Sequence, residues 1–512
     1  MKKYICEGLA NYLAKDHKPW HMPGHKRRNC IGDLSKEADI DMAAFLASSN
    51  ENKQEMEISI ENLIGLAGAM DVTEVPGTDD LHHPEEMILK SQQQLTEIYG
   101  SYASYYMVNG STGGILAAIG AVAVIKKNGQ SGSFLESENP SKIIIARNCH
   151  KSVYNACQLF GLEQIYIEPE YISLDRPTGC VEIKGQETVG ELNSHIYGDI
   201  KPEQIKELID NNPHVAAVVI TSPTYEGIVS DVEGIKKVLE PYNIPLIVDE
   251  AHGAHLPFLS EVGQLPKSAV LQGADIVVQS LHKTLPALTQ TAILHVNNEE
   301  LNAKVKKYLS IFMSSSPSYI MLCSMEQAVV DAWNRKKDLK SFNEYLNNLN
   351  CFRNSLKDLK NIKLLGKADN YYAYDETRIV LYGDINGETL ATKLRDMGNI
   401  EIEMSGINYV VLISTYADRL EDFKHLENTI KLVDEELDLR ENQFSNESNN
   451  EVLLNNQEII KELKKLVGTV SVDNIYVYPP GSYIVAAGEY ISQEAVDKIE
   501  ELMASGKRII GL

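Results

Sequence analysis

The sequence has no run of about 18 apolar residues, and its seven cysteines include no Cys-x-x-Cys pair. The missing apolar run argues against a membrane-spanning helix, and scattered cysteines are typical of free thiols in a reducing compartment. The opening residues Met1-Lys2-Lys3-Tyr4 are not followed by an apolar secretion signal. We therefore expect a cytoplasmic protein.

Positive charge is also in short supply. The chain has 48 Lys and Arg residues against 72 Asp and Glu residues, which gives a formal net charge of −24. Nucleic acids and anionic membranes repel such a protein, so neither is an expected partner. The acidic balance suits a cationic small molecule. At 512 residues, of which 43% are hydrophobic, the chain can form several globular domains.

A lysine follows one of the apolar runs. The stretch Gln279-Ser280-Leu281-His282-Lys283-Thr284 comes after 274–278, which is typical of a short buried strand. A lysine at the exit of such a strand can lie in a cleft, where loss of water lowers its pKa and makes it nucleophilic. Schiff-base chemistry on pyridoxal phosphate needs such a lysine, with donors nearby for the phosphate. A surface lysine is the alternative, and the motif alone does not decide.

Short Val- and Ile-rich runs alternate with helical segments in the first part of the chain. Strands are predicted at 105–108, 142–146, 215–220, 245–248 and 274–278, and a further one at 291–296. This pattern indicates an α/β fold with a mostly parallel sheet that helices cover on both faces. A polar cluster follows nearly every strand, and such sheets bind ligands outside the carboxyl ends of their strands. We therefore expect one site at that edge.

Changes in this pattern suggest four segments. They are an N-terminal segment at 1–70, a large cofactor-binding domain at 71–300, a small α/β domain at 301–440 and a C-terminal region at 441–512. A short helix is expected at 58–68. Residues 301–349 are expected to be helical with a break at 314–318. The stretch 441–451 is rich in Asn, Glu and Ser and is expected to be a linker or an exposed loop.

The other strand ends offer the remaining parts of a pyridoxal phosphate site. Asp249 follows the run 245–248, and its carboxylate could keep the pyridine nitrogen of the cofactor charged. His150 could stack on the ring, and the small Ala251 could pack on the opposite face. The groups that can bind the phosphate are those of Ser111, Thr112, Ser280 and His282.

The stretch Asn109-Gly110-Ser111-Thr112-Gly113-Gly114 precedes an expected apolar helix at 115–125. Hydroxyl groups, glycines and free backbone N–H groups at a helix start favour an anion. A hydroxyl cap with glycine turns is an equally good interpretation of the same residues.

Asp249-Glu250-Ala251-His252 has two competing interpretations. It matches the DEAH box of helicases, but the Gly-x4-Gly-Lys-Ser/Thr loop that this ATPase chemistry requires is absent. His252 and His255 with Asp249 could also bind a metal. Histidines at this spacing without a third clear ligand are a weak signal, so we expect no metal.

Taken together, the motifs resemble those of the Orn/Lys/Arg decarboxylases, a pyridoxal-phosphate-dependent family. The resemblance covers roughly the first 300 residues. The matching stretches are His21-Met22-Pro23-Gly24-His25-Lys26, 71–77, 79–81, 109–112, 148–152, 222–225, 249–255 and 280–283, and 478–481 and 488–489 also fit. It implies an α/β architecture of pyridoxal-phosphate-dependent transferase fold type I. The sheet would be mostly parallel and seven-stranded, with smaller C-terminal α/β domains, as in the short form of the family.

The resemblance implies decarboxylation of a basic L-amino acid, with release of CO₂ and the corresponding di- or polyamine. Arginine is favoured by analogy with other short members, while lysine and ornithine stay open. The implied catalytic residues are Lys283, Asp249, His150 and His252, and larger members commonly have Trp at the position of His252. The implied cofactor-binding residues are Lys283, Ser111, Thr112, His150, Asp249, Ala251, Ser280, His282, Ser222, Ser315 and Ser316.

The resemblance also implies a homodimer or a higher homo-oligomer with shared active sites. Ser315 or Ser316 would touch the phosphate in the partner's site, and the loop 21–28 around His25 would border its entrance. An aminotransferase or a β-eliminating lyase of the same fold is the alternative among enzymes. A non-catalytic regulator that binds pyridoxal phosphate is the alternative outside them.

Overall fold

A computed structural model describes residues 18–26, 67–68, 71–123, 141–174, 195–263, 265–368, 370–440, 459–461, 463–478, 482–504 and 508–511. Several predictions made from the sequence lie outside these residues. They are most of the helix at 58–68, the loop positions Arg27 and Arg28, the linker at 441–451 and positions 479–481 of the C-terminal motif.

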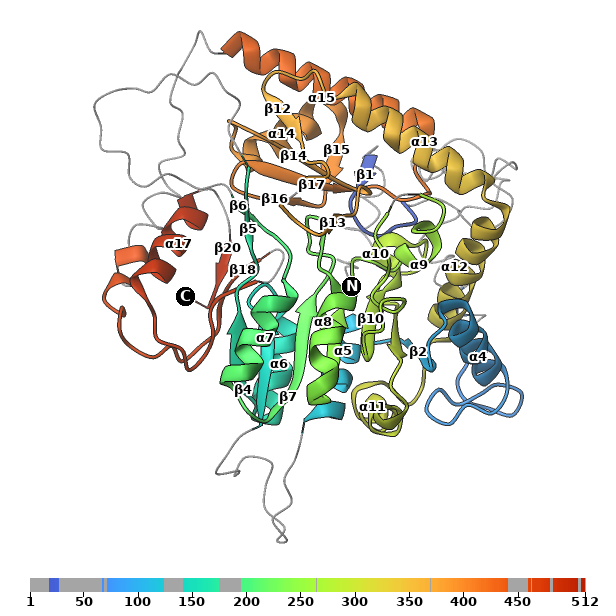
Figure 1. Cartoon of the computed structure of the whole chain (residues 1–512). Helices are drawn as coiled ribbons and strands as arrows, with labels where there is room; N and C mark the ends of the chain where they lie inside the picture. The colour runs from blue at the N-terminus through green and yellow to red at the C-terminus, as the bar shows by residue number, and fades with distance from the viewer. Residues whose placement is uncertain are drawn as a thin grey trace, which may run out of the picture.

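A seven-stranded sheet forms the centre of the molecule (Figure 1), in the order β2-β11-β10-β9-β7-β3-β4. The strands in this order are Ala103–Met107, Ala292–Val296, Ile276–Ser280, Leu246–Asp249, Val215–Thr221, Lys142–Ala146 and Glu163–Ile167. β11 pairs antiparallel with both of its neighbours, β10 and β2, and the other pairings in this sheet are parallel. The prediction of a mostly parallel α/β sheet is therefore confirmed.

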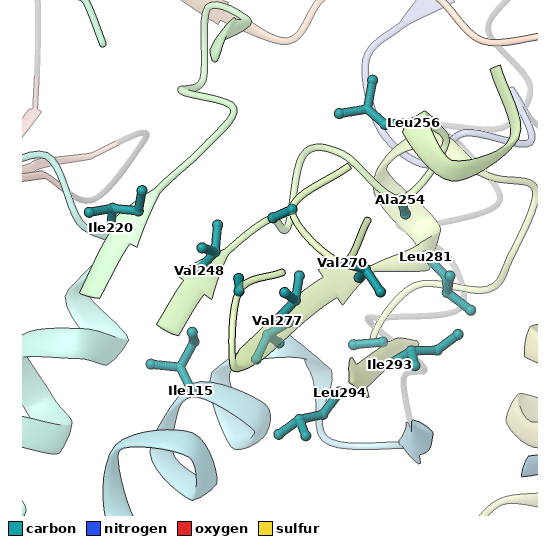
Figure 2. Packing of buried hydrophobic residues seen from close by; sticks show 14 of the residues in the cluster. Ile115, Ile220, Val248, Ala254, Leu256, Val270, Val277, Leu281, Ile293 and Leu294 are labelled. Carbon is teal, nitrogen blue, oxygen red and sulfur yellow. The ribbon is translucent and has the colours of Figure 1, made fainter. Parts of the chain in front are cut away.

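Helices cover this sheet because its strands are apolar on both faces. Helix α5 (Gly110–Val122) packs against β10, α6 (Lys151–Phe160) and α11 (Glu299–Phe312). Gly114 allows this approach, since a Cβ at that position would lie 2.8 Å from Cγ1 of Val278. Figure 2 shows Ile115 of α5 below Val248 and Val277 of the sheet. The other elements of this part are α4 (Met87–Tyr99), α7 (Pro202–Asn211), α8 (Val232–Leu239), the 3-10 turn Glu240–Tyr242, α9 (Leu256–Leu259), α10 (Leu281–Thr284), β5 (Tyr171–Ser173) and β6 (His195–Tyr197).

A second sheet lies above the first in Figure 1, in the order β12-β14-β17-β16. Its strands are Ile362–Leu364, Arg378–Gly383, Tyr409–Ile413 and Met404–Ser405. The surrounding elements are α12 (Tyr319–Asp338), α13 (Lys340–Ser355), α14 (Gly387–Gly398), α15 (Leu420–Arg440) and β15 (Ile400–Ile402). A short bridge, β8 (Ile228–Val229) with β13 (Ala373–Tyr374), joins the two parts.

The N-terminal segment is attached to this second part. β1 (Lys18–Trp20) pairs in parallel with β15. Trp20 is buried, and its ring centroid lies 5.6 Å from that of Phe423. The residues after β1 are thereby held close to the small sheet, although they precede the large sheet in sequence.

A three-stranded sheet in the order β19-β18-β20, with α17, forms the C-terminal unit beside the large sheet (Figure 1). The strands in this order are Ser482–Val485, Ile475–Tyr478 and Arg508–Ile510, and α17 is Gln493–Ala504. Tyr483 stacks on Tyr154 of α6 with ring centroids 4.1 Å apart, and Glu489 accepts a 3.0 Å bond from Arg147. Within the described part of the chain, no helix has the length and apolar character needed to cross a membrane.

Candidate active site

The carboxyl ends of β10, β9, β7 and β3 carry the polar groups of the candidate site. β10 ends at Ser280, and the single turn of α10 begins at once and presents Lys283. The Nζ atom of Lys283 lies 2.9 Å from Nε2 of His252. Burial lowers the pKa of Lys283, and the nearby carboxylate of Asp249 opposes that shift. A lysine with a lowered pKa is the nucleophile that the sequence predicted at this place.

Asp249 is the last residue of β9, between β7 and β10. It is 4% exposed, and its Oδ1 accepts a 3.2 Å bond from the backbone N–H of Ala251. Burial raises its pKa, and the charge of Lys283 counteracts this only in part. A buried carboxylate with so little compensation favours a further cationic partner. The protonated ring nitrogen of pyridoxal phosphate is a partner of that kind.

Glu250, the next residue, has a different role. Its Oε2 accepts bonds from Ser268 Oγ at 2.6 Å and Gln279 Nε2 at 2.7 Å, and its Oε1 accepts the N–H of Ala269 at 2.7 Å. Burial raises the pKa of Glu250 to about 7. Glu250 is thus held in a network within the protein, which leaves Asp249 as the carboxylate for the site.

The two histidines of the former metal interpretation also have different partners. His252 contacts Lys283, as described above, whereas His255 Nε2 lies 3.1 Å from Oδ2 of Asp375. The arrangement gives each imidazole a local role within the protein.

His150 caps α6 at the carboxyl end of β3. Its Nδ1 accepts a 3.2 Å bond from the backbone N–H of Ser152 and lies 2.9 Å from the Ser152 hydroxyl. Burial, and then the charge of Lys283, lower the pKa of His150 to about 4. At neutral pH it is an uncharged flat ring, which is suited to stacking on an aromatic cofactor. Its stacking role, and the place of the buried Ala251 on the other ring face, remain predictions.

Within the described part of the chain, the buried oxygen atoms Ser280 Oγ, Thr284 Oγ1 and Asn148 Oδ1 at this edge have no hydrogen-bond partner. Buried polar groups are nearly always paired, so unpaired ones at one edge are a feature of a site that takes a polar ligand. Ser111 and Thr112 lie in the first turn of α5, which starts at Gly110 and not at 115 as expected. Free N–H groups at such a helix start favour a phosphate. The residues present therefore fit pyridoxal phosphate.

Two expected phosphate or cofactor contacts are constrained by other bonds. His282 Nδ1 lies 3.0 Å from the carbonyl of Thr291, so a neutral His282 donates there and offers Nε2 only as an acceptor. Burial lowers its pKa. Ser222 Oγ accepts a 3.1 Å bond from the backbone N–H of Ser230. Ser222 thereby holds the turn after β7, and its contact with a cofactor remains a prediction.

Ser315 and Ser316 are exposed on this chain. The Ser316 hydroxyl donates a 3.1 Å bond to Oε1 of Glu74. Their expected contact with a partner's phosphate remains a prediction.

The loop at His21-Met22-Pro23-Gly24-His25-Lys26 packs against the site of its own chain. The N–H of Gly24 donates a 2.7 Å bond to the carbonyl of His282, and Thr415 Oγ1 donates to the Gly24 carbonyl at 2.8 Å. A Cβ at Gly24 would lie 2.7 Å from the carbonyl oxygen of Leu285, so the approach requires glycine. The loop therefore braces the Lys283 helix, and its expected position at a partner's entrance remains a prediction.

Two residues of the small domain reach the site and were not predicted. Glu403 accepts the hydroxyl of Tyr225 at 2.5 Å and the N–H of Met22 at 2.9 Å. Its charge opposes the burial that lowers the pKa of Lys283. Arg378 donates a 2.8 Å bond to the carbonyl of His252. Both are ordinary charged residues in the sequence, and no local pattern connects them with Lys283.

In this chain, a lysine and a buried carboxylate lie at the ends of adjacent strands of a mostly parallel sheet. This arrangement is that of the pyridoxal-phosphate-dependent transferase fold of type I. Among solved structures, the lysine decarboxylase LdcF of Francisella novicida shares this fold with a TM-score of 0.67. It is 18% identical in sequence, over 99% of this chain and 81% of that chain.

Sequence comparisons identify the family. The family described as Orn/Lys/Arg decarboxylase, major domain, matches residues 5–379. The chain is 31% identical to YaaO, an uncharacterized protein of Bacillus subtilis (strain 168), over 100% of this chain and 96% of that protein. It is 27% identical to an arginine decarboxylase of Bacillus anthracis, over 99% of this chain and 94% of that protein. The chain belongs to the Orn/Lys/Arg decarboxylase family, which confirms the predicted family, fold and enzyme class.

Proposed function

We propose that the protein is a pyridoxal-phosphate-dependent decarboxylase that acts on L-arginine in preference to lysine or ornithine. The observation that carries this proposal is the meeting of the Lys283 amine, the buried Asp249 carboxylate and unpaired oxygen atoms such as Ser280 Oγ at one sheet edge. Arginine is preferred because several full-length relatives, including those of Bacillus anthracis and Bacillus subtilis, are named arginine decarboxylases.

The residues divide the work of the reaction among them. Lys283 would hold the cofactor through Nζ, and Asp249 would keep a proton on the ring nitrogen. Ser280, with Ser111 and Thr112 at the start of α5, would hold the phosphate. When bound, pyridoxal phosphate accepts the electron pair that is left as CO₂ departs.

A cationic substrate agrees with the charges around the site. The carboxylate of Glu403 lies close enough to Lys283 to oppose the effect of burial on its pKa. The whole chain carries a formal net charge of −24. Both features attract a molecule with a guanidinium or ammonium group at its far end.

The test is to incubate the purified protein and pyridoxal phosphate with arginine, lysine or ornithine, and to measure CO₂ and identify the amine. We expect the highest kcat/KM with arginine, and no product from Lys283→Ala. Amino transfer that depends on a keto acid, without CO₂, would identify an aminotransferase instead. Cofactor binding without either reaction would identify a regulator.

We further propose that the active unit is a cytoplasmic homodimer with shared sites that supplies amines for polyamine biosynthesis. The shared-site part of the proposal is supported by the exposure of Ser315 and Ser316 on this chain, where Ser316 binds Glu74. Mixing Lys283→Ala protein with a Ser315→Ala/Ser316→Ala double variant should restore activity in one site of each mixed dimer. A mixture that stays inactive after verified subunit exchange would show that each site is built from one chain.

A further inference from the structure

A buried row of polar side chains extends from Lys283 into the small domain. Its members are Lys283, His252 and Arg378. Lys283 Nζ lies 2.9 Å from His252 Nε2, and Arg378 Nη2 lies 3.4 Å from His252 Nδ1 on the other side of the ring. Arg378 also donates a 2.8 Å bond to the carbonyl of His252, which fixes the guanidinium beside the imidazole.

Arg378 is placed where it can act only through its neighbours. It is the first residue of β14 and is 0% exposed, so it is closed off from solvent and from a bound substrate. It packs on Gly227, where a Cβ would lie 2.7 Å from Arg378 Cγ. Its Nε and Nη1 have no hydrogen-bond partner among the described residues. A buried cation with this little compensation is costly, which points to a function for its charge.

The positive charge of Arg378 is balanced by a carboxylate, that of Asp375, on one side only. Burial raises the pKa of Asp375, but the charges of His255 and Arg378 bring it down to about 2, so that it stays ionised. His252, on the other side, faces the guanidinium of Arg378. Burial is the largest cause that puts the pKa of His252 well below its usual range, and the charge of Arg378 adds to it. His252 is therefore neutral, with one proton on one of its two nitrogens.

Arg378 decides which nitrogen carries that proton. A guanidinium only donates hydrogen bonds, so the nitrogen that faces it, Nδ1, must be the acceptor. The proton of His252 then lies on Nε2 and is directed at Lys283 Nζ. That contact is favourable only when Lys283 is an uncharged amine, which can accept the bond. A hydrogen bond to the neutral form disfavours the charged form.

We propose that Arg378 is a positioning residue that fixes the tautomer of His252 and, through it, keeps Lys283 in the free amine form. The inference rests on the proposed function, because the lysine must be uncharged to bond to an aldehyde. It also gives His252 a role at a position that the sequence left unexplained. The guanidinium of Arg378, in the small domain, thereby keeps the Lys283 amine of the large domain ready to react.

Competitive acetylation tests the proposal on the full-length, cofactor-free protein. Acetic anhydride bonds to an uncharged amine, acetate leaves, and the amine proton passes to solvent, so the yield against pH reports the lysine pKa. We expect Lys283 to react at lower pH than Lys90, an exposed lysine. In Arg378→Met the Lys283 profile should move to higher pH by about one unit, which means about tenfold less reaction near neutral pH. An unchanged Lys283 profile in folded Arg378→Met would overturn the proposal.

A second variant separates the route through His252 from a direct effect of charge. His252→Gln should also shift the Lys283 profile to higher pH, and Arg378→Met should add little in that background. Equal shifts with and without His252 would show that Arg378 acts by charge alone, and the tautomer mechanism would be wrong. Arg378→Lys retains the charge without the guanidinium geometry, so it should recover only part of the wild-type profile.

Arg353→Met is a matched control for loss of a buried arginine. Arg353 lies in the same domain and donates to the backbone carbonyl of Arg378 at 3.3 Å, not to His252. It should lower stability without moving the Lys283 profile. Because acetylation needs neither cofactor nor amino acid, its result stands whether or not the protein decarboxylates arginine. A failure of the Arg378 proposal can therefore be distinguished from a failure of the proposed decarboxylase function.

Discussion

Two clusters of polar groups lie around the carboxyl ends of β9 and β10 and differ in how well their hydrogen bonds are satisfied. The Lys283 cluster contains Lys283, Asp249, His252 and Ser280. The Glu250 network contains Glu250, Ser268, Ala269 and Gln279. In the network, three donors bind one carboxylate at 2.6–2.7 Å. In the cluster, the described residues offer the Ser280 hydroxyl no partner, and Asp249 accepts a 3.2 Å bond from the N–H of Ala251.

The comparison shows how to separate a structural carboxylate from a functional one. Asp249 and Glu250 are adjacent, both are buried and both carry a carboxylate, so neither position nor charge tells them apart. An unsatisfied buried group costs about 1–3 kcal/mol, so a cluster of them is retained where a ligand supplies the missing bonds. The Glu250 network stabilises the protein alone, whereas the Lys283 cluster becomes satisfied only with a ligand. Variants of the two groups should therefore affect different measurements.

The largest effect is expected for Lys283→Ala. Decarboxylation should fall by about a thousandfold or more, because the nucleophile is lost. The yellow colour of cofactor bound to the lysine should disappear, while the thermal unfolding temperature stays near that of the wild type. CO₂ release, visible absorbance and calorimetry measure the three quantities. Lys90→Ala is the control, since Lys90 forms an exposed ion pair with Glu86. Full activity in Lys283→Ala would show that Lys283 is not the nucleophile and that the Lys283 cluster is not the active site.

Asp249→Asn should give the next largest effect. Turnover should fall by about a hundredfold or more, because a neutral amide cannot hold the ring nitrogen charged. Stability without cofactor should be equal or higher, since the raised pKa of Asp249 reflects a buried charge with little compensation. Steady-state kinetics and unfolding of the cofactor-free protein measure both. A stability loss with normal turnover would show that Asp249 is a structural carboxylate and would make Glu250 the candidate for the functional one.

Most of the large sheet was predictable, because its strands are continuous apolar runs. The run predicted at 142–146 coincides with β3, and that at 215–220 differs from β7 by one residue. β4 was missed because it is an edge strand that begins with Glu163 and Gln164 and has no such run. The start of α5 was placed too late, because Gly113 and Gly114 suggested a turn. In the structure they lie in the helix, where Gly114 allows contact with the sheet.

The site was predictable only where it follows a strand in sequence. Lys283, Asp249 and His150 each come directly after an apolar run, so the topology of a parallel sheet brings them to one edge. Arg378 and Glu403 come from the small domain and meet this edge through tertiary packing alone. The bracing of the Lys283 helix by the loop at Gly24 has the same origin. Such contacts depend on how domains pack, which no local spacing encodes.

Ser280→Ala should weaken cofactor binding and little else. A hydrogen bond to a charged group contributes about 1.5–3 kcal/mol, so the Kd for pyridoxal phosphate should rise by roughly tenfold to a hundredfold. Stability of the cofactor-free protein should not fall, because the Ser280 hydroxyl has no hydrogen-bond partner to lose among the residues that the structure describes. Equilibrium dialysis and thermal unfolding measure the two quantities. Ser268→Ala is the matched control: it should lower stability, since Ser268 donates to Glu250, and leave the Kd unchanged.

The smallest effect is expected for Glu250→Gln, and it should appear in stability only. The Glu250 carboxylate accepts three hydrogen bonds, and the –NH₂ of glutamine would point a donor at one of those donors. The free energy of unfolding should fall by about 1–3 kcal/mol. Turnover per folded molecule should stay within about twofold of the wild type. Glu233→Gln is the control, because Glu233 is 51% exposed and should change stability by less than about 0.5 kcal/mol.

The effect of Glu250→Gln should also depend on pH. Burial raises the pKa of Glu250 from its ordinary value of 4.5 to about 7. Between these values the folded state holds a proton that the unfolded state has released, so unfolding becomes easier as pH rises. This contribution is complete below about pH 4.5 and is lost as pH passes about 7. Glutamine does not titrate, so the stability difference between wild type and variant should be larger at pH 6 than at pH 8. Urea unfolding at both values measures it, and a difference that is the same at pH 6 and pH 8 would mean that Glu250 stays ionised in its network.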